Sequence, residues 1–348
     1  MTTVELALPH VSRRAGQIRT IGATLAAVAL GLAAGSILIV IAGGRPWSTY
    51  RDMAGGAYGS LFGFGAVLVQ TAPLLVIGLG LALAFRGRVY NIGAEGQFYI
   101  GALAGGAAVI LLPLRLYPLL IALAMVAGIV GGGAWGWVVG KLRARWGVNE
   151  VISSLLLNYI GIFVFSYAVR NPLRDPEASS LASKAVPDGS RLPTFPHLFT
   201  HVGILVGLAL VPLVWYVMDR TPFGFRVRMM GLNADAARVA GVDTSRMIVR
   251  LMVISGGLAG LAGIVQVLGV QGRLETTLSQ GYGFTAIVVA LLGRLRAVGV
   301  LLAALFVSGL IVGGQAASID QGLPYAIVLG IQGVFVVFVL VADRFARA

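Results

Sequence analysis

Residues 57–85 read AYGSLFGFGAVLVQTAPLLVIGLGLALAF, an apolar stretch without a single Asp, Glu, Lys, Arg or His. A transmembrane helix needs about 20 such residues to cross roughly 30 Å of hydrocarbon. The stretch is too long for one straight crossing and contains Pro73, so we expect a helix that is kinked or broken into two pieces. An apolar run of this length predicts a membrane-spanning protein.

Working outward, the chain contains ten apolar segments: 21–43, 57–85, 96–112, 117–140, 151–169, 201–218, 248–270, 281–293, 297–313 and 324–342. Segment 21–43 is too long for the apolar part of a signal peptide and is expected to be a retained first helix. Segment 281–293 is too short to span and opens with Gly281-Tyr282-Gly283, which predicts a half-helix or a re-entrant piece. The predicted fold class is all-α, a polytopic transmembrane helical bundle of about ten segments.

The composition excludes other classes of protein. Of the 348 residues, 58% are hydrophobic and only 11% are charged, whereas soluble domains carry about 25% charged residues. The net charge of +13 does not indicate nucleic-acid binding, because no soluble module is evident and the basic residues lie in short loops. The chain has no Cys, so it has neither disulfides nor thiolate metal ligands.

The distribution of basic residues predicts the orientation. If the N-terminus is inside and the segments alternate, 18 of the 26 Lys and Arg residues lie inside and 8 lie outside. This bias favours cytoplasmic N- and C-termini. We therefore expect a cytoplasmic tail over 1–20, a single permease domain over 21–343 and a second tail over 344–348. Within the domain, a Pro-rich loop (about 170–200) lies outside and a basic loop (about 219–247) lies inside.

Several kinds of chemistry have no signature in the chain. The only lysines, Lys141 and Lys184, do not stand in the G-x-x-x-x-G-K-[ST] context of a P-loop. The three histidines form no H-E-x-x-H motif, and we expect no metal site and no enzymatic activity. No Asp or Glu lies deep within an apolar segment, although ion-coupled carriers usually have one there. The energy for transport is therefore expected from another polypeptide, and an ion-coupled secondary carrier remains the alternative of another class.

Small residues recur at four-residue spacing. Gly128, Gly132, Gly136 and Gly140 form one ridge, and Gly256 with Gly260 repeats the spacing. Such ridges let transmembrane helices approach closely, so we expect helix–helix contacts along them.

The inner loop contains LNADAARVAG at 232–241. Asn233 is a good N-cap, Asp235 suits the positive end of a helix, and Gly241 suits a left-handed C-terminal stop. The alanines between them favour helix. A short cytosolic helix with few bulky apolar residues is expected to be a docking element.

Asp235-Ala236-Ala237 followed by Gly241 is similar to the E-A-A-x-x-x-G loop of ABC importer permeases, with Asp in place of Glu. The preceding Arg220-Thr221-Pro222-Phe223-Gly224 also resembles the lead-in of that loop. The resemblance implies a coupling helix that sits in a groove of an ATPase subunit. The residues that it implies for coupling are Asn233, Asp235, Ala236, Ala237, Arg238 and Gly241.

Asn91-Ile92-Gly93-Ala94-Glu95-Gly96-Gln97 closely resembles the N-I-G-x-E-G-Q signature of ABC permeases for branched-chain amino acids, ribose and nucleosides. Residues 148–159 (VNEVISSLLLNY), 171–176 (NPLRDP) and 281–293 (GYGFTAIVVALLG) are similar to the nucleoside-type branch. These matches occur in order from about residue 70 to 300. The signature residues are Asn91, Gly93, Glu95, Gly96, Gln97, Asn149 and Glu150.

The resemblance implies the membrane permease of an ATP-driven importer for a nucleoside or a simple sugar in a bacterial inner membrane. It implies two cytosolic ATPase subunits, which would bind ATP and Mg, a second permease subunit that is identical or different, and an extracytoplasmic substrate-binding lipoprotein. No cofactor is expected on this chain, and the Pro-rich outer loop is one expected docking place for the lipoprotein. The alternative cargoes are ribose-like sugars and branched-chain amino acids.

Polar side chains within the apolar segments are candidates for the substrate path. Asn and Gln can hydrogen-bond a ribose hydroxyl or a base edge, although contacts between helices are the commoner use of such residues. The candidates are Asn158, Gln70, Gln266 and Gln332, with Asn158 ranked first because it lies in a branch-specific stretch.

Overall fold

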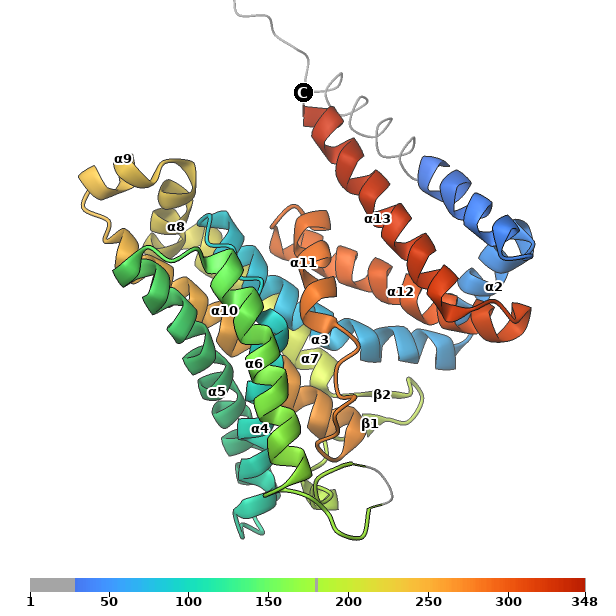
Figure 1. Ribbon diagram of the computed structural model, residues 1–348, viewed down its shortest axis with the longest axis horizontal. Coiled ribbons are helices and arrows are strands. Elements are labelled where there is room, and N and C mark those ends of the chain that lie inside the picture. Colours follow the sequence, from blue (N-terminus) through green and yellow to red (C-terminus); the bar gives the residue numbers. More distant parts are fainter. Residues whose placement is uncertain (1–28, 179–180, 348) are drawn as a thin grey trace, which may run out of the picture. The chain divides into compact units, whose positions relative to one another are not determined.

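The computed structural model describes residues 29–178 and 181–347, which are mostly helical (Figure 1). The helices are Ala29–Ile41, α2 (Pro46–Tyr58), α3 (Leu61–Arg86), α4 (Ala94–Leu111), α5 (Tyr117–Trp146), α6 (Glu150–Arg170), α7 (Gly203–Arg220), α8 (Pro222–Leu232), α9 (Ala234–Val239), α10 (Thr244–Gln266), α11 (Tyr282–Leu292), α12 (Ala297–Gln321) and α13 (Tyr325–Arg347). A π-helix, Val267–Gln271, extends α10. The strands β1 (Thr194–Phe195) and β2 (Thr200–His201) pair antiparallel.

The chain divides into two compact units. The smaller unit combines the described residues up to Met53 with those from Gly314 onward. Its core contains Ile39, Leu323 and Ile331, and the helix Ala29–Ile41 meets α2 at an angle of 111°. The larger unit, residues 54–313, contains the elements that make up the candidate site.

Helix α3 lies at the centre of the larger unit, where it packs against α7, α10 and α11. Every residue from 71 to 85 is buried. The helix begins after Ser60, whose hydroxyl accepts the Gly63 N–H at 3.0 Å, and it continues through Pro73. Of the two expectations for 57–85, a kink or a break into two pieces, a break at Pro73 is therefore excluded. The segment is instead divided at Gly59 and Ser60, between the end of α2 and the start of α3. Within apolar surroundings, a break would leave backbone groups unpaired at a cost of several kcal/mol each, which favours one helix.

Seven helices of the described residues are long and apolar enough to cross a membrane: α3, α4, α5, α6, α7, α10 with its π-helical extension, and α12. The bent pair Ala29–Ile41 and α2 makes eight if it counts as one span. The prediction that 281–293 is too short to span is confirmed, since α11 has only 11 residues. The polytopic helical class is thus confirmed, whereas ten crossings and the placement of the termini remain predictions.

The glycine ridges meet where α4, α5 and α10 pack together. A Cβ atom placed at Gly132 would lie 2.3 Å from the carbonyl oxygen of Gly256 on α10. One placed at Gly101 of α4 would lie 2.1 Å from the Cα of Gly260. The predicted ridges are therefore helix contacts, and the backbones approach so closely that only glycine fits.

Three local elements do not follow from the apolar pattern. Helix α2 lies almost entirely between the predicted segments 21–43 and 57–85. Helix α8 lies in the basic loop 219–247. The π-helix Val267–Gln271 follows α10 directly. Helices α2 and α8 are amphipathic or polar, so a search for apolar runs does not detect them. Between Asn171 and Phe199, the described residues of the Pro-rich loop form no regular helix, as the prolines predict, apart from one 3₁₀ turn at Asp188–Ser190.

His201 on β2 is buried beside the start of α7. Its Nδ1 accepts the Gly203 N–H at 3.1 Å, and its Nε2 has no partner among the described residues. Burial lowers the pKa of the His201 imidazole from 6.5 to about 4. Protonation is disfavoured further because Nδ1 already faces a donor.

The low pKa of His201 predicts that acid destabilises the fold. The unfolded imidazole takes up its proton near pH 6.5 and the folded one near pH 4, so stability is complete above the first value and decreases between the two. We expect His201→Gln to reduce the loss of melting temperature over this range, measured on the purified chain in detergent. The exposed His197 provides the control, since His197→Gln should retain the wild-type slope.

Candidate functional site

Residues 91–97, which form the end of the loop after α3 and the first turn of α4, contact several helices. The Asn91 Nδ2 donates to Gln97 Oε1 at 2.8 Å and to the Ser255 hydroxyl of α10 at 2.9 Å. The Asn91 Oδ1 accepts the Gly93 N–H at 3.0 Å. Asn91 and Gln97 are both fully buried. The signature residues thus form a satisfied polar network that fixes the loop inside the bundle.

Glu95 at the start of α4 and Glu150 at the start of α6 each connect two elements. Glu95 accepts the Gly283 N–H of α11 at 2.6 Å, which connects α4 to the start of the short helix. Glu150 forms an ion pair with Arg143 and accepts the Tyr90 N–H at 3.4 Å. Asn149 caps α6 by accepting the Val151 N–H at 2.9 Å. In this structure the signature residues therefore hold elements together.

Asn158 is engaged in the same network. Its Oδ1 accepts the Gly96 N–H at 2.7 Å, and its Nδ2 donates to the Ile92 carbonyl at 2.8 Å. The side chain is only 1% exposed. Through these two hydrogen bonds Asn158 connects α6 to residues 91–97. Its place on the substrate path remains a prediction.

Gln70 and Gln266, which are far apart in the sequence, meet at one hydroxyl. The Tyr282 hydroxyl donates to Gln70 Oε1 at 3.1 Å and lies 3.5 Å from Gln266 Nε2. Gln266 Nε2 also lies 3.4 Å from Gln271 Oε1 on the π-helix. We call Gln70, Gln266, Gln271 and Tyr282 the glutamine–tyrosine cluster.

The cluster combines buried and accessible polar groups. Gln266 and Tyr282 are 4% and 5% exposed, whereas Gln70 and Gln271 are partly exposed. Gln266 Oε1 is buried and has no hydrogen-bond partner among the described residues. Since an unpaired buried acceptor costs about 1–3 kcal/mol, a hydroxyl donor from a solute would be stabilised there.

Tyr282 and Gln271 were not among the sequence candidates. Tyr282 is the first residue of the short helix α11, and Gly281 before it has φ +86°. The short segment and its Gly-Tyr-Gly opening were the signal that could have identified it. Gln332 lies on α13 in the smaller unit, and its role on the substrate path remains a prediction.

Helices α8 and α9 form an arm, residues 222–241, at one end of the larger unit (Figure 1). The predicted cap is present, since the Asn233 Oδ1 accepts the N–H groups of Asp235 and Ala236, both at 3.0 Å. Gly241 has φ +82°, as expected for the left-handed stop. Ala237 alone is buried among residues 232–241, while Leu232 and Val239 are 81% and 91% exposed.

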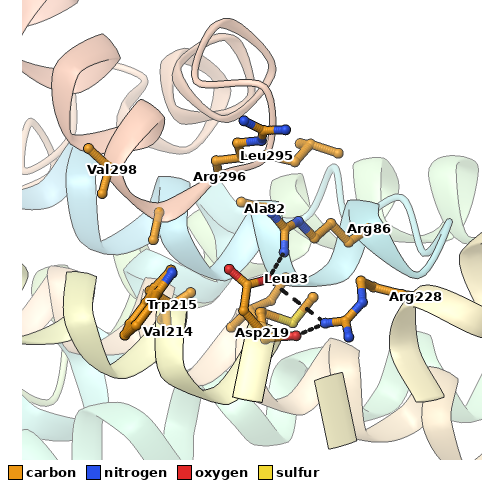
Figure 2. A pocket seen from close by; sticks show the side chains of 12 residues that line it. Ala82, Leu83, Arg86, Val214, Trp215, Asp219, Arg228, Leu295, Arg296 and Val298 are labelled. Carbon is orange, nitrogen blue, oxygen red and sulfur yellow. Dashed lines mark hydrogen bonds and ion pairs between the residues drawn. The ribbon is translucent and has the colours of Figure 1, made fainter. Parts of the chain in front are cut away.

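A cavity of about 410 Å³ lies where the arm joins the bundle (Figure 2). Asp219 at the end of α7 lies between Arg86 of α3, at 3.3 Å, and Arg228 of α8, at 3.8 Å. A Cβ atom at Gly231 would lie 1.9 Å from the Arg86 carbonyl oxygen, so α8 packs directly on the end of α3. A displacement of the arm would therefore be transmitted to the central helix.

Comparisons with known proteins identify the family to which the chain is similar. Residues 63–340 match the family model described as the branched-chain amino acid transport system permease component. The chain is 36% identical over 339 residues to the glucose ABC transporter permease protein of Haloferax volcanii, covering 94% of this chain and 88% of that protein. It is 34% identical over 340 residues to the guanosine ABC transporter permease protein NupP of Bacillus subtilis, covering 90% and 91%. It is 30% identical over 335 residues to the nucleoside ABC transporter permease protein NupB of Lactococcus lactis, covering 91% and 90%.

Proposed function

The chain belongs to the family of branched-chain amino acid transport permease components, and from this premise we propose that it forms the translocation path for a nucleoside or a simple sugar. It is a multi-pass membrane protein and a transport component of an ABC system. The cargo class is supported by relatives whose names specify glucose, guanosine and nucleosides.

The glutamine–tyrosine cluster is the observation that favours a path for hydroxyl-bearing solutes. Its groups are neutral, and amide and phenol groups both donate and accept hydrogen bonds, which suits sugar hydroxyls and base edges. The unpaired Gln266 Oε1 offers an acceptor within the bundle. The cluster also lies at the start of α11, an unusually short apolar helix, and such short segments often mark the substrate sites of transporters.

Removing single polar groups from the cluster tests this proposal. We expect Tyr282→Phe and Gln266→Leu to raise the KM for uptake roughly three- to ten-fold while the maximal rate changes little, because each loses about one hydrogen bond to the solute. Guanosine and glucose are the probes, with initial uptake rates measured in cells that express the complete transporter.

Tyr58→Phe is the control, because it likewise removes a tyrosine hydroxyl that donates a hydrogen bond, to the Leu305 carbonyl at 3.3 Å, but Tyr58 lies outside the cluster. An unchanged KM in both cluster variants would remove the cluster from the path. The same assay on Asn158→Ala decides whether the Asn158 side chain also contacts the solute.

The arm supports a proposal for the energy source. We assign α9 and its flanking residues to docking on an ATPase subunit, because two large apolar side chains, Leu232 at the end of α8 and Val239 at the end of α9, are exposed there. The residues assigned to docking are Asn233, Asp235, Ala236, Ala237, Arg238 and Gly241. ATP and Mg would bind to that partner, and the chain itself would catalyse no reaction. Two ATPase subunits, a second permease and an external binding lipoprotein complete the proposed transporter.

This assignment places the arm, both termini and the basic ends of α5 and α10 in the cytoplasm. The excess of Lys and Arg in these segments supports that orientation. The membrane would be the bacterial inner membrane, and the outer loop 170–200 would face the binding lipoprotein.

A further inference from the structure

Helices α5 and α10 lie side by side in the larger unit (Figure 1). Two adjoining hollows, which together we call the α5–α10 groove, lie between them. The first hollow, the apolar part of the groove, has a volume of about 550 Å³ and is lined by Ile129, Val130 and Trp137 of α5 and by Val253, Ile254 and Leu258 of α10. Its floor is formed by Gly133 and Gly257, both buried. Neither glycine projects a side chain into the hollow, and a Cβ atom at Gly257 would lie 3.2 Å from Ile129 Cγ2.

The second hollow is basic and has a volume of about 400 Å³, and it adjoins the first at Trp137, which lines both. The basic cluster that lines this hollow consists of Lys141 and Arg145 of α5 with Arg246 and Arg250 of α10. In each pair the cations are four residues apart on one helix face, where like charges repel.

The cations are only partly compensated within the described residues. Arg246 pairs with Asp243 at 3.0 Å, and Arg145 stacks on Trp146 at 5.3 Å. No carboxylate of the described chain forms an ion pair with Lys141, Arg145 or Arg250. The basic cluster therefore favours an external anion, and its position at the helix ends beside a tryptophan is that of a membrane–water interface.

We propose that the α5–α10 groove binds an anionic glycerophospholipid, with its acyl chains along the apolar part and its headgroup phosphate on the basic cluster. An ATPase subunit would cover only the basic end, and an apolar helix of a second permease would leave four cations opposite an uncharged surface. A lipid with a negative headgroup matches both parts at once. This proposal is independent of the transported solute.

The test uses the full-length chain purified in detergent and titrated with phosphatidylglycerol or phosphatidylcholine of the same acyl chains, with binding read by native mass spectrometry. The wild type is expected to bind phosphatidylglycerol at least ten-fold more tightly. The double variant Arg246→Gln/Arg250→Gln should lose this preference. The matched control Arg226→Gln/Arg296→Gln removes two arginines outside the groove and should retain it.

Two further variants separate the contribution of charge from that of the groove's shape. Arg246→Lys/Arg250→Lys keeps the charge and should keep the preference, so a loss there would show that charge is not the cause and would overturn the proposal. Gly133→Leu fills the groove and should weaken the binding of both lipids. Equal binding of the two lipids by the wild type would overturn the proposal. Full displacement of bound phosphatidylglycerol by inorganic phosphate would also overturn it. So would the finding that the chain is a dimer which Gly133→Leu dissociates while lipid binding stays the same.

Discussion

Val239→Asp is expected to reduce ATP-driven uptake by at least ten-fold while the amount of folded permease in the membrane stays the same. Val239 is 91% exposed at the end of α9, so a carboxylate there meets no neighbour in the isolated chain. In a docked complex it would replace a buried apolar contact worth about 1.5–3 kcal/mol. Leu232→Asp, at an 81% exposed position, should act in the same way.

Two measurements distinguish a docking arm from a passive loop. ATPase subunits co-expressed with the permease should no longer co-purify with Val239→Asp, and uptake should fall in parallel. Val239→Ile keeps an apolar side chain at the same position and should behave as the wild type. Retained ATPase binding and normal uptake in Val239→Asp would contradict the assignment.

The internal residues of the arm should give a different result. Ala237 is 1% exposed, so a bulky replacement would displace α9 from α8 and α10. Gly241→Pro is incompatible with a φ of +82°, because proline holds φ near −65°. Both changes should uncouple ATP hydrolysis from uptake by misplacing the arm, without unfolding the membrane part.

Gly132→Ala is expected to lower the melting temperature of the purified chain by roughly 5 °C or more. The new Cβ would lie 2.3 Å from the Gly256 carbonyl oxygen and 2.8 Å from the Gly260 Cα. Both obstacles are backbone atoms, so α5 and α10 must separate, which costs about 1–3 kcal/mol or more. Thermal unfolding in detergent, followed by size-exclusion chromatography, measures the effect.

A matched control and a double variant sharpen this test. Gly55 of α2 has no heavy atom within 4 Å of its Cβ position, so Gly55→Ala should leave the melting temperature unchanged or slightly raised. Gly260→Ala alone should destabilise as Gly132→Ala does, because its Cβ would lie 2.2 Å from the Gly128 carbonyl oxygen. The double variant Gly132→Ala/Gly260→Ala should lower the melting temperature by less than the sum of the two single effects, because the helices need to separate only once. An unchanged melting temperature in Gly132→Ala would show that the helices do not depend on this contact.

The candidate site could be predicted only in part. Gln70 and Gln266 were identified individually as polar groups in apolar segments, but nothing in the pattern indicated that one tyrosine hydroxyl lies between them. Asn158 was the first-ranked candidate for the substrate path, yet its amide forms hydrogen bonds with the backbone of residues 91–97. Contacts between segments far apart in the chain depend on packing, which periodicity does not encode.

The sequence alone determined the membrane-spanning class, the short α11 segment and the local form of α9. These follow from apolar length and from caps such as Asn233 and Gly241, which act within a few residues of themselves. Only the tertiary structure decided that α3 continues through Pro73, that the glycine ridge of α5 faces Gly256 and Gly260, and that four cations meet at the end of an apolar groove. These features arise between helices, where the partner of each surface is set by the packing of the whole unit.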